Sequence, residues 1–238
     1  MAFKTSFVIL FLKSKKLKLF NYDATEHCVL AQRSEHIIRG HAERLPAIVE
    51  QTLNEAKLDF SDMTHLAVTE GPGSFAGIRV GISFVRALAL ALKIPAIGVS
   101  SLQAMAFGAA HAGACNAIAL LDARRGEIFS AIVDLDGKYL QEPQALTIEA
   151  AMKVTLDAGL QADLVLCGNG IDVFGPEFVD TNSDLKIIHR NAAPPLEFVA
   201  KLALKLIHKE SIASPKPQYL RHADAKLNQN FALERTLK

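Results

Sequence analysis

The sequence has few cysteines and almost no net charge. Its 238 residues include three cysteines, which lie far apart and form no CxxC pair. That spacing argues against a zinc knuckle or a disulfide-stapled scaffold, and it is typical of a protein in the reduced cytoplasm. The formal net charge is +1, so no overall basic field indicates a protein that wraps nucleic acid.

The N-terminus also lacks an apolar run of membrane-spanning length. Residues 7–12 are apolar, but lysines follow at once and no small-residue cleavage site is present. The run is far too short to cross a bilayer. We therefore expect it to be a buried first strand rather than a signal peptide, and we expect no membrane partner.

The common nucleotide-binding and hydrolase motifs are missing. The glycines at 71, 73 and 77 fit neither GxxxxGK[ST] nor GxGxxG, and the serine among them is not in a GxSxG elbow. What is there is an apolar strand, a glycine-rich turn and a long apolar helix over residues 66–81. Two interpretations stay open: an anion site at a helix start, or a tight turn in which Ser74 caps the helix.

Hydrophobic periodicity predicts two successive α/β halves. We expect strands near 7–12, 17–22, 28–35, 63–69, 94–99, 117–121, 128–134, 138–141 and 163–167, and helices near 41–56, 77–92, 147–158 and 196–209. The predicted domains are 1–106 and 107–222, followed by a polar tail at 223–238. The helix at 77–92 is apolar nearly all round, which is typical of a helix that is buried on several sides or docks on a partner.

Several segments together resemble the bacterial TsaB (YeaZ) family. They are GPGSFAGIRVG at 71–81, ALALA at 87–91, PAIGVSSL at 95–102, DARRGE at 122–127 and PQYLR at 217–221. The resemblance implies an actin/Hsp70-like fold made of two tandem ribonuclease H-like α/β domains. It also implies a part in threonylcarbamoyl transfer to the N6 of adenosine 37 in tRNAs that read codons starting with A.

The same resemblance implies a noncatalytic scaffold in the cytoplasm. It would bind and activate TsaD together with TsaE, reach tRNA through that complex, and form a homodimer in isolation. TsaD carries an HxxxH metal motif where this chain has Ser101 and Met105. A hydroxyl and a thioether replace imidazole poorly, so we expect no metal site. The expected partner face is formed by apolar residues of the two helices at 41–56 and 77–92: Leu45, Ile48, Val49, Leu53, Ile78, Ile82, Val85 and Leu88.

The candidate ligand contacts lie in the glycine turn and in the charged DARRGE run. For a nucleotide or another anion they are Gly71, Gly73, Ser74, Arg79, Asp122 and Arg124, with no catalytic residue. We expect no cofactor of the chain's own, although ATP or ADP could lie at a shared interface. Arg79 could bind a phosphate, pair with an acidic partner or remain solvated, and residues 122–127 form either a cleft cluster or a solvated turn.

One departure from the family pattern concerns the first hairpin. Lys13, followed by Ser14, stands where the family has an Asp that would help to position hydrated magnesium. The alternative functions are an ATP- or ADP-binding ATPase of the same fold and a metal-dependent hydrolase. The missing HxxxH motif argues against the hydrolase.

Overall fold

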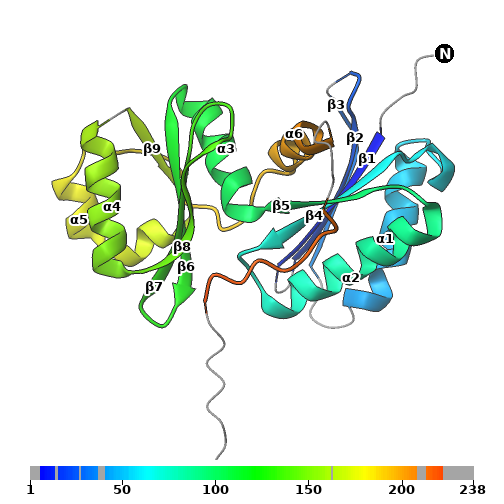
Figure 1. The fold of residues 1–238 in the computed structure, drawn as a ribbon, viewed down its shortest axis with the longest axis horizontal. Coiled ribbons are helices and arrows are strands. Elements are labelled where there is room, and N and C mark those ends of the chain that lie inside the picture. Colours follow the sequence, from blue (N-terminus) through cyan, green and yellow to red (C-terminus); the bar gives the residue numbers. More distant parts are fainter. Residues whose placement is uncertain are drawn as a thin grey trace, which may run out of the picture.

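Two five-stranded sheets with the same strand order frame the molecule (Figure 1). The computed structural model describes residues 6–13, 16–26, 28–36, 41–161, 163–207 and 213–221. The predicted polar tail and Ser14 lie outside these ranges, and the Lys13 backbone pairs with Lys16. The first lobe is built on the first sheet and the second lobe on the second sheet.

Each sheet combines an antiparallel meander with two parallel strands. The first sheet, in the order β3-β2-β1-β4-β5, contains β1 (Ser6–Lys13), β2 (Lys16–Asp23), β3 (Cys28–His36), β4 (His65–Gly71) and β5 (Ala96–Ser100). The second, in the order β10-β9-β6-β7-β8, contains β6 (Asn116–Arg124), β7 (Glu127–Val133), β8 (Tyr139–Thr147), β9 (Leu164–Cys167) and β10 (Lys186–His189). β4 runs parallel to β1, as β9 does to β6. This repeated topology confirms the expected pair of ribonuclease H-like domains.

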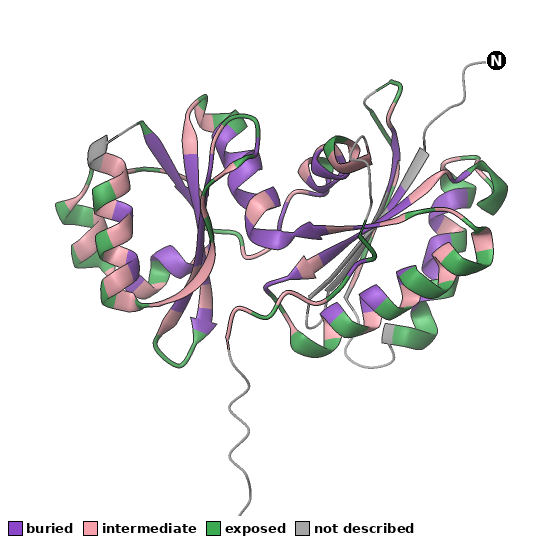
Figure 2. Ribbon diagram, in the orientation of Figure 1, coloured by how far each residue is buried: buried purple, intermediate pink, exposed green. Residues whose placement is uncertain are grey.

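The helices form three layers that alternate with the two sheets (Figures 1 and 2). Helices α1 (His41–Glu55) and α2 (Phe75–Leu92) cover the outer face of the first sheet. Helices α3 (Ser101–Gly113) and α6 (Leu196–Ile207) lie between the sheets. The outer face of the second sheet carries α4 (Ile148–Gln161), the 3-10 turn η2 (Asn169–Phe174) and α5 (Pro176–Thr181), while η1 (Phe60–Asp62) precedes β4.

Side-chain alternation along the strands supplies each layer with its apolar contacts. In β4, Leu66 and Val68 face α1 and α2, whereas Ala67 faces the middle layer. In β6, Ile118 points outward and Ala119 inward. Alanines of β6 and β7 face α3, so this helix can lie close to the second sheet.

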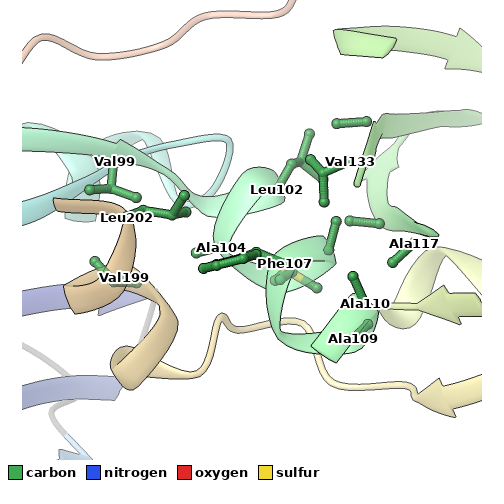
Figure 3. Packing of buried hydrophobic residues seen from close by; sticks show 14 of the residues in the cluster. Val99, Leu102, Ala104, Phe107, Ala109, Ala110, Ala117, Val133, Val199 and Leu202 are labelled. Carbon is green, nitrogen blue, oxygen red and sulfur yellow. The ribbon is translucent and has the colours of Figure 1, made fainter. Parts of the chain in front are cut away.

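The middle layer joins the two lobes into one core. Figure 3 shows Phe107 of α3 between Val99 and Leu202 on one side and Val133 and Ala117 on the other. Although α6 follows the second sheet in sequence, it packs on β5, β1 and β4 of the first sheet. The boundary that we expected after residue 106 lies inside α3.

The predicted partner face needs correction. Seven of its eight residues are buried within the chain, and Leu88 of α2 is half-buried. They face the outer side of the first sheet, where the apolar stripes of α1 and α2 cover Leu66 and Val68 of β4. An apolar sheet face in water is costly, so the chain's own helices use these residues as core. They are therefore not available as a contact surface.

Apolar side chains remain exposed on the opposite side of α2, together with Arg79, Ser83 and Arg86. Phe75 is 57% exposed and Leu90 81% exposed, and only 22% of the helix is buried. By length and composition alone, α2 is long and apolar enough to cross a membrane. In this fold its buried side instead lies on the first sheet, and Ser74 caps its first turn.

Candidate interlobe site

The glycine turn connects β4 to α2 at the junction between the lobes. The Ser74 hydroxyl oxygen accepts the Gly77 N–H at 3.4 Å, so Ser74 caps the helix, as one of the two interpretations of the turn requires. Gly71 has φ +112°, and a Cβ there would lie 2.9 Å from Ile78 Cδ1 and 3.3 Å from the Gln218 carbonyl oxygen. Both the backbone conformation and the lack of space therefore require glycine at 71.

The DARRGE run forms the tip of the β6–β7 hairpin. Asp122 Oδ1 accepts the backbone N–H of Arg124 at 2.8 Å, and Asp122 Oδ2 lies 3.5 Å from Arg124 Nε. Arg124 and Arg125 have φ values of +64° and +56°. The Asp122 carboxylate therefore holds a left-handed hairpin turn together.

The turn and the hairpin face each other across a small cavity of about 310 Å³. Gly73 and Ser74 line it from the first lobe, Asp122 and Arg124 from the second. Four of the six predicted ligand contacts thus surround one space. Arg79 lines an adjoining groove, and Gly71 is buried beside the turn without lining the cavity.

A C-terminal segment, residues 213–221, crosses both lobes, and we call it the strap. Its Lys216 and Gln218 N–H groups donate to Glu70 Oε1 at 2.8 Å and to the Glu70 carbonyl oxygen at 2.9 Å. Arg221 Nε donates to Glu127 Oε2 at 2.6 Å, and its Nη2 donates to the Arg124 carbonyl oxygen at 3.1 Å. The strap therefore joins the end of β4 to the β6–β7 hairpin. The sequence marks PQYLR as a family segment but gives no sign of this contact.

The Glu70 carboxyl group is half-buried between β5 and the strap. Burial raises its pKa, although the Lys216 backbone N–H and the Lys216 charge oppose the rise. The Glu70 side chain lies over Gly98 of β5, where an added Cβ would be 1.9 Å from Oε1. Glycine at 98 thus makes the room that this carboxyl group occupies.

Arg79 packs against two aromatic rings, a contact that the sequence does not indicate. Its guanidinium carbon lies 3.8 Å from the centre of the Phe75 ring, and its Nε donates to the Tyr219 hydroxyl at 2.8 Å. The Phe75 and Tyr219 rings are 5.6 Å apart. Arg79 is therefore part of an aromatic stack on the surface.

The positions that correspond to the HxxxH motif are closed to solvent. Ser101 is 3% exposed and Met105 is fully buried in the middle layer. Within the described ranges, no group of three or more His, Cys, Asp or Glu residues is placed to hold a metal ion. The Asp122 carboxylate is occupied with Arg124, so the arrangement suits binding of an anion better than acid–base chemistry.

Comparison with known proteins agrees with this architecture. A family model described as TsaD, tRNA N6-adenosine threonylcarbamoyltransferase, matches residues 29–232. The chain belongs to this family. TsaB proteins and a YeaZ structure are also among its relatives, in agreement with the resemblance of the glycine-turn segments.

Individual relatives point to the TsaB branch. The chain is 38% identical over 115 residues to the tRNA threonylcarbamoyladenosine biosynthesis protein TsaB of Escherichia coli, covering 44% of this chain and 50% of that protein. It is 29% identical over 117 residues to TsaB of Bacillus subtilis, covering 49% and 51%. The chain thus spans about half the length of the curated relatives it matches.

A solved structure supports the fold along nearly the whole chain. YeaZ from Pseudomonas aeruginosa is 23% identical, with a TM-score of 0.69, and the match covers 91% of this chain and 100% of that one. This TsaB-family protein therefore has the YeaZ fold.

Proposed function

We propose that this TsaB-family protein is a noncatalytic subunit of the machinery that makes threonylcarbamoyladenosine in tRNA. It acts in the cytoplasm by binding and activating TsaD together with TsaE, and it reaches tRNA through that complex. The buried Ser101 and Met105, in place of the metal-binding histidines, support a role without chemistry of its own. We assign the chain no cofactor of its own. Any ATP or ADP would lie at an interface that the chain shares with a partner.

The outward surface of α2 is the observation that carries this proposal. Leu90, Ala87 and Ala91 are exposed on the C-terminal half of a helix whose other side is already buried. Val80 and Phe84 are half-buried earlier in α2 and line a cavity of about 420 Å³ that α1 also lines. Covering such a surface with a partner removes apolar area from water. We place the TsaD contact, and the homodimer contact in isolation, on this surface.

Replacing Leu90 with glutamate tests this placement. Leu90→Glu puts a charge on the proposed contact surface without disturbing the core, and we expect TsaD affinity to fall about tenfold or more. Co-purification with TsaD is the measurement, followed by a tRNA modification assay in which each subunit is omitted in turn.

The matched control is Leu140→Glu, at a 58% exposed leucine on β8 of the second lobe. It introduces the same charge and should leave TsaD binding unchanged. Equal TsaD binding by both variants would contradict the α2 interface. Val85→Glu is unsuitable, because Val85 is 2% exposed and the change would disrupt folding.

A further inference from the structure

A groove of about 800 Å³ adjoins the interlobe cavity and has a distinct chemistry. The start of α2, the β6–β7 hairpin and the strap form its walls. No described carboxylate lines it. Its lining contains four arginines and an exposed aromatic pair: Arg79, Arg124, Arg125, Arg221, Phe75 and Tyr219.

The aromatic pair is held in place before any ligand arrives. Arg79 lies against the Phe75 ring and donates a hydrogen bond to the Tyr219 hydroxyl, so it connects α2 to the strap. The planes of the two rings are inclined by 34°. Phe75 is 57% and Tyr219 51% exposed, which leaves ring surface open to a planar ligand.

The hairpin presents arginines where turns usually have other residues. Arg124, Arg125 and Gly126 all have positive φ, although Asn and Gly are preferred in such hairpin turns. The left-handed conformation is strained for a residue with a side chain. Asp122 and Arg221 hold the turn through the hydrogen bonds described above. The Arg124 side chain remains 84% exposed at the groove.

These features together match the chemistry of an unstacked nucleotide. Aromatic rings and arginine planes stack on exposed bases, and guanidinium groups pair with phosphates. Arg221 pairs with Glu127 and Arg124 with Asp122, but none of the described acids lines the groove itself. An extended anionic strand fits this surface better than a duplex, whose bases are inaccessible to stacking.

We infer that the groove binds single-stranded RNA, with one base against the Phe75–Tyr219 pair and phosphates at Arg124 and Arg125. The choice of RNA rests on the proposed function in tRNA modification. This contact would let the subunit hold an unpaired segment of the tRNA while its partner carries out the transfer.

Binding of a short fluorescein-labelled single-stranded RNA to the full chain tests the inference. We expect Arg124→Gln/Arg125→Gln to weaken binding about tenfold or more. The slope of log affinity against log salt concentration should fall by about one for each phosphate that the variant no longer binds. The matched control is Lys153→Gln/Lys186→Gln, which removes the same charge from two exposed positions on α4 and β10. Equal weakening in both double variants, or equally tight binding of a duplex of the same length, would overturn the inference.

A tryptophan probe tests the stacking contact separately. The sequence has no tryptophan, so Tyr219→Trp places the chain's single tryptophan in the groove. Single-stranded RNA should quench its emission, whereas Phe60→Trp, at a 37% exposed position in η1, should remain unchanged. Unchanged emission of the Tyr219→Trp protein, or equal quenching by a free mononucleotide, would contradict an RNA site.

TsaD co-purification separates this inference from the proposed function. The Arg124→Gln/Arg125→Gln protein should still bind TsaD, since the hairpin lies outside the exposed surface of α2. If the double variant binds TsaD and also binds RNA as tightly as the unsubstituted protein, only the inference about the groove is refuted. RNA binding at the groove without TsaD association would refute the proposed complex alone.

Discussion

At the scale of single residues, Glu70 shows how the strap depends on a buried carboxyl group. Its side chain and its carbonyl oxygen both accept strap N–H groups, and Gly98 provides the space beneath it. Because burial raises the Glu70 pKa, the folded chain holds the proton more tightly than the unfolded chain. This tighter proton binding stabilises the folded chain at pH values below the ordinary pKa of 4.5. The stabilisation is lost as pH rises through the folded-state pKa.

Glu70→Gln should remove this pH dependence while keeping an oxygen acceptor for Lys216. We expect the stability difference between the variant and the unsubstituted protein to favour the variant more at mildly alkaline pH than at acidic pH. Thermal melts of both proteins at each pH give the difference. Glu177→Gln, at an exposed position on α5, is the charge-matched control. The same stability difference at both pH values would contradict the role assigned to Glu70.

Sequence reasoning succeeded for residues whose role is local. A helix cap at Ser74 is one of the two interpretations that the sequence leaves open, because a cap acts within one turn, and the structure contains that cap. The setting of Arg79 could not be predicted, because Tyr219 lies 140 positions away along the chain. Such a contact leaves no periodic pattern near either residue.

At the scale of elements, the middle layer carries the connection between the lobes. Phe107 of α3 packs edge-on against Phe198 of α6, with ring centres 5.3 Å apart, and it is 2% exposed. It also packs against the turn at Gly137, where an added Cβ would lie 3.0 Å from the ring. The ring is therefore enclosed on several sides.

Phe107→Ala should lower the free energy of unfolding by about 3–5 kcal/mol, because it leaves a cavity among elements that cannot readily collapse. Urea denaturation followed by circular dichroism measures the change. The control, Leu140→Ala at an exposed site, should cost about 0.5 kcal/mol or less. A small effect at Phe107 would show that the layer repacks freely.

The elements differ in how far the sequence specified them. Strands with strong apolar runs and the amphipathic α1 were predicted close to their observed bounds. The sequence pattern indicated no helix limits for α3, because it is buried on both sides and alternation of polar and apolar residues is absent. The partner face was misplaced for a related reason: the periodicity of α1 marks a buried stripe, but it does not say whether the chain or a partner covers it.

At the scale of the whole molecule, the strap links the two lobes without a regular element. It bonds with Glu70 in the first lobe and with Glu127 in the second. The strap lines the groove of about 800 Å³, whereas no strap residue lines the interlobe cavity. The shape of the groove therefore depends on the strap as well as on the two lobes.

A chain that ends after residue 212 should keep both sheets and lose the strap. We expect its unfolding free energy to drop by about 2–4 kcal/mol, from several hydrogen bonds worth about 1 kcal/mol each. Calorimetry would compare it with a chain that ends after residue 221 and retains the strap. Equal melting temperatures would mean that the strap contributes no stability.

The return of α6 to the first sheet also sets the order in which the protein can be completed during translation. β5 ends at Ser100, whereas α6 begins at Leu196. At about 5–20 residues per second, the ribosome needs roughly 5–20 seconds to make the intervening chain. Throughout that interval α6 is missing from one face of the first sheet. The first sheet is therefore made early but is among the last parts of the fold to be covered.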